Sequence, residues 1–339
     1  TMSDYRALLD WFAAEGVTVV NRSLGARDDG HGDGRGALDE LADHAVSLGM
    51  VWVNSGGNNG SGKYHRDAVT VSDGWVDFGG TRYLAFEGTA QLAGVRWSTD
   101  WDLPAAERSD YDVFVYRAPD GHPERGTLVA SSTRRQTTGA DPLEIVGGSY
   151  APGDGERIYL AVQYVGGGST RGDVLEVLDY GDGIVGATDV AGSAATPIVD
   201  STNPGVISVG AIDPPTSGAI ASYSAQGPTT DGRIVPTLSA ATGYSNCVWG
   251  TFSGTSAAAP VVAAAAALVL GAGLAGAPAE VAAVLTAAAS DLGPIGADNA
   301  FGVGEVRLPL LVGTDAAPAT ADPVTPATDG ASSYVPVTP

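Results

Sequence analysis

A serine at the start of a predicted helix is the strongest candidate for chemistry in this sequence. The segment 253–260 reads Ser-Gly-Thr-Ser-Ala-Ala-Ala-Pro, and an alanine-rich helix is expected to follow it to about Leu270. The N-terminus of a helix carries partial positive charge and free N–H groups, which can stabilise an oxyanion beside a nucleophile. Ser256 is therefore a candidate nucleophile, and the alternative is that its hydroxyl only caps the helix.

Several segments, taken in their order along the chain, resemble the subtilisin-like serine proteases. Residues 254–260 resemble the family's nucleophile motif, Gly-Thr-Ser-x-x-x-Pro. Residues 19–25, Val-Val-Asn-Arg-Ser-Leu-Gly, resemble its substrate-binding strand end, and residues 55–60, Ser-Gly-Gly-Asn-Asn-Gly, resemble its oxyanion turn. The resemblance spans roughly residues 3–64 and 186–311, with further matches at 206–211, 222–228, 231–236 and 301–306.

The resemblance implies a role for each matched residue. Ser256 would attack the scissile carbonyl, and Asn58 would donate its side-chain N–H to the oxyanion together with the Ser256 backbone N–H. Without the other matches, Asn58 would be read as part of an ordinary Asn-Asn-Gly turn. The residues expected to pair with an extended substrate are Ser23, Leu24 and Gly25, and those expected to line the pocket for the residue before the cut are Ser55, Gly56 and Gly57.

The family's Asp-(Ser/Thr)-Gly and His-Gly-Thr-His motifs are absent from the sequence. None of the four histidines (His31, His44, His65 and His122) stands in a matching place, and His44 is expected to be solvated. Without its base a serine is a weak nucleophile, so the chain as given is expected to be nearly inactive. The favoured explanation is a serine endopeptidase whose catalytic Asp and His lie upstream, and the alternative is an inactive subtilisin-like module that binds proteins.

Two departures from the family pattern concern the stretch around the nucleophile. Residues 236–243, Pro-Thr-Leu-Ser-Ala-Ala-Thr-Gly, lack an expected aspartate and a second proline, and Ala257 replaces a common methionine. The sedolisins share the nucleophile motif but have an aspartate at the position of Asn58. The asparagine therefore favours the subtilisin branch.

Helices and short apolar strands alternate in the two stretches that carry these motifs. Helices are expected at 3–15 and 37–48, with Ser3 as the N-cap of the first, and strands at 17–20 and 50–53. After residue 185, a strand at 205–212 precedes the helix to Leu270 and another at 278–289. This pattern predicts an α/β fold of subtilisin type, a mainly parallel sheet with helices on both faces.

The stretch between these two parts has a different character. Short alternating strands and turn signals predict an inserted antiparallel β-sandwich, with strands at 83–86, 91–97, 111–116, 127–130 and 157–163. A packing or spacer role is favoured for it over binding of substrate, carbohydrate or calcium. The predicted divisions are 1–64 and 186–312 for the catalytic domain, 65–185 for the insertion, and 313–339 for a Pro/Thr/Ala-rich linker or disordered tail.

The composition excludes several classes of function. The 339 residues include 17 Lys+Arg against 39 Asp+Glu, a formal net charge of −22, which excludes a nucleic-acid binder driven by phosphate neutralisation. The only cysteine, Cys247, cannot form an internal disulfide. No apolar run is long enough to cross a membrane. The expected partner is a protein or peptide substrate and the expected location is extracellular.

No cofactor is required by this chemistry. The acidic loops at 28–33 and 179–182 offer oxygen ligands for Ca²⁺, but neither has a full ligand spacing. A solvated loop is therefore the favoured interpretation, and no metal site is assigned.

Overall fold

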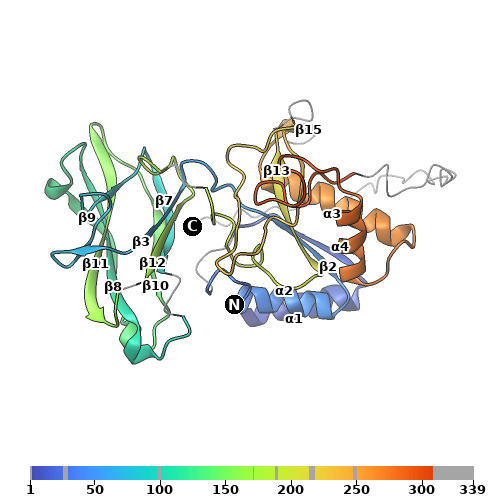
Figure 1. Cartoon of the computed structure of the whole chain (residues 1–339), viewed down its shortest axis with the longest axis horizontal. Coiled ribbons are helices and arrows are strands. Elements are labelled where there is room, and N and C mark those ends of the chain that lie inside the picture. The colour runs from blue at the N-terminus through green and yellow to red at the C-terminus, as the bar shows by residue number, and fades with distance from the viewer. Residues whose placement is uncertain are drawn as a thin grey trace, which may run out of the picture.

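The computed structural model of the chain describes residues 2–25, 30–97, 101–170, 172–187, 190–213, 218–246 and 250–307. The chain forms two regions that lie beside each other (Figure 1). We call the described residues within 2–63 and 190–307 the α/β region, and those within 64–187 the β region. The tail predicted at 313–339 lies outside the described residues, as does Cys247.

A four-stranded sheet forms the centre of the α/β region. Its order is β1-β2-β13-β14, and every neighbouring pair is parallel. The α/β fold with a parallel sheet is therefore confirmed. The strands are β1 (Val19–Arg22), β2 (Val51–Ser55), β13 (Val206–Ile212) and β14 (Leu238–Ala241).

The first strand begins two residues later than the sequence predicts. The N–H of Val17 still donates to Phe12 O at 2.9 Å, so the turn that ends the preceding helix continues through this residue. Strand β2 also extends two residues further than predicted, to Ser55.

Two helices cover each face of the parallel sheet (Figure 1). Side chains alternate across a strand, so Val51 and Val53 pack toward α3 (Thr255–Gly271) and α4 (Pro278–Ala287). The side chain of Trp52 points to the opposite face. Where α3 and α4 contact the sheet, the side chains are mainly alanine, valine and leucine.

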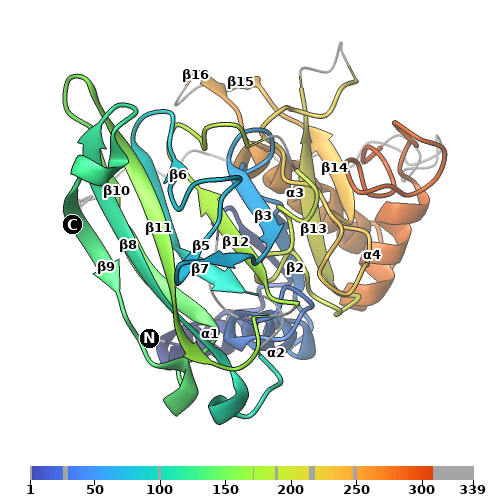
Figure 2. The same cartoon turned by 60° about the vertical axis from the view of Figure 1, so that its left-hand side comes forward.

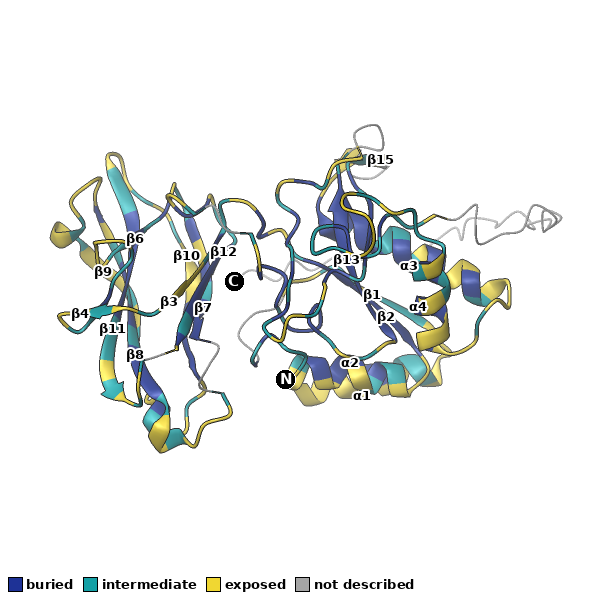
Figure 3. Cartoon of the chain, in the orientation of Figure 1, coloured by how far each residue is buried: buried dark blue, intermediate teal, exposed yellow. Residues whose placement is uncertain are grey.

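The second face is covered by α1 (Met2–Ala14) and α2 (Ala37–Ser47). Trp52 packs there among apolar side chains of both helices, including Leu9 and Leu41. Because α1 begins at Met2, Ser3 lies inside its first turn, and the prediction that Ser3 is the N-cap is wrong. The outer side of α1 is exposed (Figure 3).

The β region consists of two antiparallel sheets that share one apolar core (Figure 2). The first has the order β10-β7-β12-β3, and the second has the order β4-β5-β11-β8-β9, with β6 paired to β11. Their strands are β3 (Tyr64–Ala68), β4 (Val71–Ser72), β5 (Trp75–Val76), β6 (Leu84–Ala85), β7 (Ala90–Trp97), β8 (Ser109–Pro119), β9 (Thr127–Ser132), β10 (Leu143–Tyr150), β11 (Glu156–Gly167) and β12 (Val174–Asp179).

Five of these strands were not predicted from sequence: β4 and β5, which have only two residues each, and three longer strands. Strand β3 is mostly polar, β12 carries a buried glutamate, and β10 is interrupted by Gly147 and Gly148, where the register shifts. A short hairpin, β15 (Tyr244–Asn246) with β16 (Gly250–Phe252), and three short 3-10 turns complete the described elements. The turns are η1 (Ala105–Glu107), η2 (Pro123–Arg125) and η3 (Gln136–Thr138).

A buried ion pair lies where the two regions meet. Arg96 of β7 donates to Glu176 of β12 at 2.5 Å, and its other nitrogens donate to Ala195 O at 2.6 Å and Gly30 O at 3.4 Å. Tyr64 donates to the same carboxylate at 2.7 Å, and burial together with Glu176 raises the pKa of Tyr64. Burial alone would lower the pKa of Arg96, but Glu176 outweighs this effect and raises it. Arg96 therefore stays charged, and it ties the β region to two backbone carbonyls of the α/β region.

Candidate active site

Ser256 lies in the first turn of α3, one residue after the helix begins at Thr255. The residue at the N-cap position is Gly254, which has no side chain with which to cap the helix. Ser256 is half-buried. It therefore stands beside the N–H groups of the first turn, where the helix dipole favours negative charge.

Gly254 has a backbone conformation that only glycine adopts readily, with φ 113° and ψ 163°. A Cβ atom at this position would also lie 3.2 Å from Asn58 Nδ2. The N–H of Gly254 donates to the Thr242 hydroxyl at 2.9 Å and to the Tyr223 hydroxyl at 3.0 Å. Both side chains thus hold the chain as it enters α3, and the sequence analysis did not identify either of them.

Asn58 is held by the residue that precedes the candidate nucleophile. Its Oδ1 accepts hydrogen bonds from the backbone N–H and the hydroxyl of Thr255, each at 2.9 Å. The Thr255 hydroxyl in turn accepts from Gly57 N at 3.1 Å. Because Oδ1 is occupied in this way, the amide is oriented with its Nδ2 donor on the other side, and Asn58 is exposed. Thr255 is thus a third residue that the sequence analysis left without a role.

Ser23, at the end of β1, contacts Ser256 directly. Its hydroxyl donates to Ser256 O at 2.9 Å, and the Ser256 hydroxyl donates to Ser23 O at 3.4 Å. Leu24 and Gly25 follow on the exposed side, with 57% of Leu24 accessible. The structure therefore brings one residue of this predicted trio to the candidate nucleophile and leaves the other two open to solvent.

The three residues predicted to line a pocket differ in exposure. Ser55 and Gly56 are buried, and Gly57 is half-buried with φ 103°. A Cβ atom on Gly56 would lie 2.9 Å from Val209 O, so glycine is required here for contact with the neighbouring strand. Of the three, Gly57 is the one with backbone accessible beside Asn58.

Two residues of the β region reach this neighbourhood. The buried Asn59 donates from Nδ2 to Asp179 O at 2.8 Å, and Asp179 ends β12. The next residue, Tyr180, lies against Gly25, where a Cβ atom would meet its ring at 3.4 Å. The Asp179 carboxylate accepts three backbone N–H groups, at 2.7–3.0 Å, which fix this turn.

Within the described part of the chain, each of the four histidines lies beside a residue other than Ser256. His31 Nε2 lies 3.1 Å from Asp102 Oδ2, and His122 Nδ1 lies 3.2 Å from Glu124 Oε1. The ring of His65 stacks edge-on against Phe78. The prediction for His44 is wrong, because packing of α2 on α1 places its Nε2 2.7 Å from Asp10 Oδ1 with only 17% of the side chain exposed.

No group of three or more His, Cys, Asp or Glu side chains suited to a metal ion occurs among the residues that the structure describes. Part of the acidic loop at 28–33 lies outside them. In the other acidic loop, Asp182 accepts from Thr89 N at 2.8 Å. Nor does any helix among these residues have the length and apolarity needed to span a membrane.

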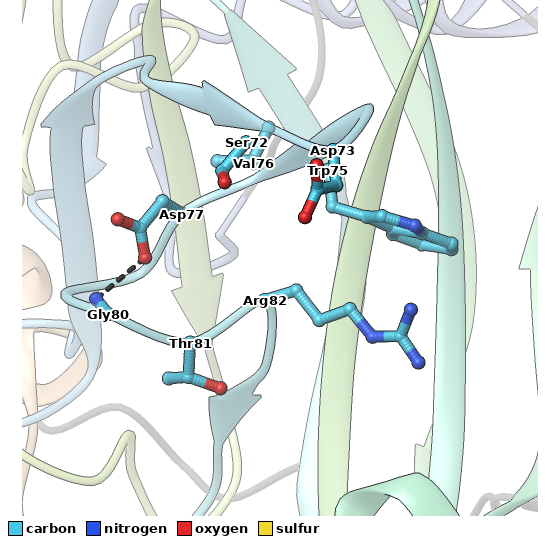
Figure 4. A pocket seen from close by; sticks show the side chains of 8 residues that line it. All are labelled: Ser72, Asp73, Trp75, Val76, Asp77, Gly80, Thr81 and Arg82. Carbon is cyan, nitrogen blue, oxygen red and sulfur yellow. Dashed lines mark hydrogen bonds between the residues drawn. The ribbon is translucent and has the colours of Figure 1, made fainter.

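A pocket of about 360 Å³ lies in the β region between β4, β5 and the loop that follows (Figure 4). Asp77 accepts there from Gly80 N at 2.6 Å, while Trp75 lies beneath the Arg82 guanidinium at 4.9 Å. No residue of the predicted active site lines this pocket.

Comparison with known proteins places these features in a family. The model of the subtilase family of peptidases matches residues 106–304, which include Ser256 but neither Ser23 nor Asn58. A search of curated proteins found no match in sequence.

Among solved structures, the CspB protease of Clostridium perfringens is similar with a TM-score of 0.58 and 18% identity, over 91% of this chain and 69% of that one. A lanthipeptide protease (15% identity, TM-score 0.39, 92% of this chain and 65% of that one) and MycP1 (17% identity, TM-score 0.39, 92% and 67%) also match, with lower TM-scores. The chain thus spans about two thirds of the length of these structures. Because the family model covers more than half of the chain, this protein belongs to the subtilase family.

Proposed function

We propose that this chain is the nucleophile-bearing part of a secreted serine endopeptidase that hydrolyses peptide bonds of proteins through an acyl-enzyme on Ser256. The observation that carries the proposal is the joint placement of Ser256 and Asn58. Ser256 stands in the first turn of α3, and Thr255 orients the Asn58 amide beside it. Membership of a peptidase family supports the same reaction.

In this mechanism the Ser256 hydroxyl attacks the substrate carbonyl, and the resulting oxyanion accepts hydrogen bonds from Asn58 Nδ2 and the Ser256 N–H. Collapse of this intermediate breaks the peptide bond, releases the amine and leaves the acyl group on Ser256, from which water then removes it. Preorganised donors of this kind stabilise the transition state because they need no reorientation during the reaction. The substrate would lie as an extended strand along Ser23, Leu24 and Gly25. Gly57 would border the residue before the cut.

The proton of Ser256 needs an acceptor other than Ser23 O. The described histidines lie beside Asp102, Asp10, Phe78 and Glu124, so the proposal assigns the base to an Asp/His pair upstream of this chain. Strand β1 is at the edge of the described sheet and can accept a further strand there. Loss of the histidine in such a triad costs about 10⁶ in kcat, so the chain alone would turn over very slowly.

A labelled fluorophosphonate tests this proposal, because it modifies only an activated serine. The open reading frame is extended upstream of Thr1, and both its product and the present chain are treated with the reagent and with unfolded casein. We expect the longer product to be labelled at Ser256 and to cleave casein, and its Ser256→Ala variant to do neither.

The same experiment also tests the alternative function, in which the chain is an inactive module that binds extended protein segments. In that case no product is labelled, while binding of unfolded casein persists and is unchanged by Ser256→Ala. The observation behind this alternative is that no histidine contacts Ser256 among the described residues.

A further inference from the structure

A proline interrupts the hydrogen bonding of the helix that carries Ser256. In an α-helix the N–H of each residue donates to the carbonyl four residues earlier. Pro260 lies within α3, four residues after Ser256, and has no N–H. The carbonyl of Ser256 therefore lacks the main-chain donor that a helix would ordinarily supply to it.

The hydroxyl of Ser23 occupies the place of that missing donor. It donates to Ser256 O at 2.9 Å, across 233 positions of sequence. Asn21 Nδ2 donates to the same hydroxyl oxygen at 3.1 Å, which leaves the Ser23 proton directed toward Ser256. A hydroxyl that accepts a hydrogen bond becomes a stronger donor in the hydrogen bond that it makes itself. The end of β1 thus provides the hydrogen-bond donor to Ser256 O that Pro260 cannot supply.

The next carbonyl of this turn is also held by a side chain. The Tyr244 hydroxyl donates to Ala257 O at 2.7 Å, and burial raises the pKa of Tyr244, so the hydroxyl stays protonated at neutral pH. In the other direction, the Ser256 hydroxyl donates to Ser23 O. The turn that carries the candidate nucleophile is therefore positioned by groups outside the helix.

We propose that the Ser23 hydroxyl is a positioning residue that replaces the helix hydrogen bond removed by Pro260. It thereby fixes the nucleophile at a set distance from the strand end that pairs with substrate. Its effect on catalysis rests on the proposed function, whereas the replacement of one donor by another is a property of the folded chain. The two parts are tested separately.

A double-mutant cycle on Ser23→Ala and Pro260→Ala tests the replacement in this chain, with urea unfolding as the readout. We expect Ser23→Ala to lower the folding equilibrium constant about fivefold to tenfold in the Pro260 background, the range of one hydrogen bond. In the Pro260→Ala background we expect a loss under about twofold, because the new N–H pairs with Ser256 O. Equal losses in both backgrounds would overturn the proposal.

Two control variants separate this coupling from general effects. Ser23→Thr keeps the hydroxyl and should retain most of the wild-type equilibrium constant. Ser47→Ala removes a different hydroxyl, which donates to His44 O at 2.7 Å in α2, and should cost the same in both backgrounds. Coupling of Ser47 to Pro260 would contradict a specific exchange of donors.

A spectroscopic measurement reports on the carbonyl itself. Only four Ser–Ala pairs occur in the sequence, at 193–194, 224–225, 239–240 and 256–257, so serine carbonyl-¹³C with alanine-¹⁵N labelling reduces the spectrum to four carbonyl signals. The signal that disappears in Ser256→Ala is that of the Ser256 carbonyl. We expect its signal to move upfield in Ser23→Ala and to return in the double variant. An unmoved signal would refute the hydrogen bond in solution.

Turnover by the longer product tests the positioning role. We expect Ser23→Ala to lower kcat with KM little changed, and Ser23→Thr to restore kcat. If the cycle shows coupling but kcat is unchanged, the hydroxyl is structural and its positioning role is refuted. If no variant, wild type included, turns over substrate, the proposed function fails, while the cycle and the carbonyl signal still decide the replacement.

Discussion

The cores of the two regions are built from different side chains. The core cluster beneath α3 and α4 contains only alanine, valine, isoleucine and leucine among its buried members. The core of the β region contains buried aromatic rings, with Trp97 packed edge-on against Tyr111 at a centroid distance of 4.9 Å. Stacked sheets lie about 10 Å apart and need large side chains to fill the space, whereas small side chains let a helix approach a sheet closely.

The small side chains of the α/β core allow the close approach of helix and sheet that the candidate active site requires. The buried face of α3 consists largely of alanine, so its first turn comes within hydrogen-bonding distance of the ends of β1 and the loop after β2. Among the described residues, the side chains of the β region make no hydrogen bond to Ser256 or Asn58. The β region contributes supporting contacts, from Arg96 to the backbone of the α/β region and from Asp179 to Asn59.

The largest expected effect concerns the ion pair between the regions. Arg96→Met leaves Glu176 buried without its main partner, and we expect the free energy of unfolding to fall by about 3–5 kcal/mol. Arg66→Met is the matched control, since Arg66 lies 3.4 Å from the same carboxylate with 37% of its side chain exposed, and should cost under about 1 kcal/mol. Urea unfolding measures both. Equal costs would show that the two regions do not depend on this buried pair.

The second prediction concerns pH and a buried acid of the α/β region. Burial raises the pKa of Asp200 to about 6, although Gly34 N donates to it at 3.0 Å. Between about pH 4 and pH 6 the folded state then binds more protons than the unfolded state, so this group makes stability fall as pH rises through that window. The loss is on the order of 3 kcal/mol and is complete above pH 6.

Asp200→Asn removes this titration, so its stability relative to wild type should rise between pH 4 and pH 6. The difference between the two unfolding curves isolates Asp200 from the other acids. Asp120→Asn, at an exposed carboxylate of the β region bonded to Arg157, is the control and should not alter this window. A constant difference between Asp200→Asn and wild type from pH 4 to pH 7 would contradict the raised pKa.

The third prediction compares backbone strain in the two regions through one glycine substitution in each. Gly254→Ala forces a side chain into φ 113°, ψ 163° and brings its Cβ close to Asn58, and should cost about 2 kcal/mol. Gly155→Ala, at φ 70° with open space around the added Cβ, should cost about 1 kcal/mol. Thermal unfolding ranks the two, and the reverse order would show that the start of α3 relaxes.

The smallest expected effect tests whether the β region supports the Asn58 loop. Asn59→Ala removes a buried donor to Asp179 O and should cost about 1 kcal/mol. It should also speed hydrogen exchange at the backbone N–H of Gly57, which donates to the Thr255 hydroxyl, because one side of the loop is released. Unchanged exchange at Gly57 would indicate that Thr255 alone holds the loop.

Much of the architecture could be predicted from local pattern. Alternating helices and apolar strands predicted the parallel sheet, and apolar periodicity placed α2 and α4 within two residues of their observed ends. Strand β12 could not be predicted, because Glu176 reads as a surface residue until Arg96 and Tyr64 are brought to it. The same limit applies to His44, whose partner Asp10 lies on a different helix.

By itself, the sequence determined which residues could act: a serine at a helix start, a proline four residues later, and an asparagine among glycines. These depend on local backbone chemistry, which neighbouring residues specify. Only the tertiary structure decided how they are held. Thr255 orients Asn58 and Ser23 bonds to Ser256 because the helix, the strand end and the loop converge at one edge of the sheet. Such contacts join residues about 200 positions apart, and no local pattern encodes them.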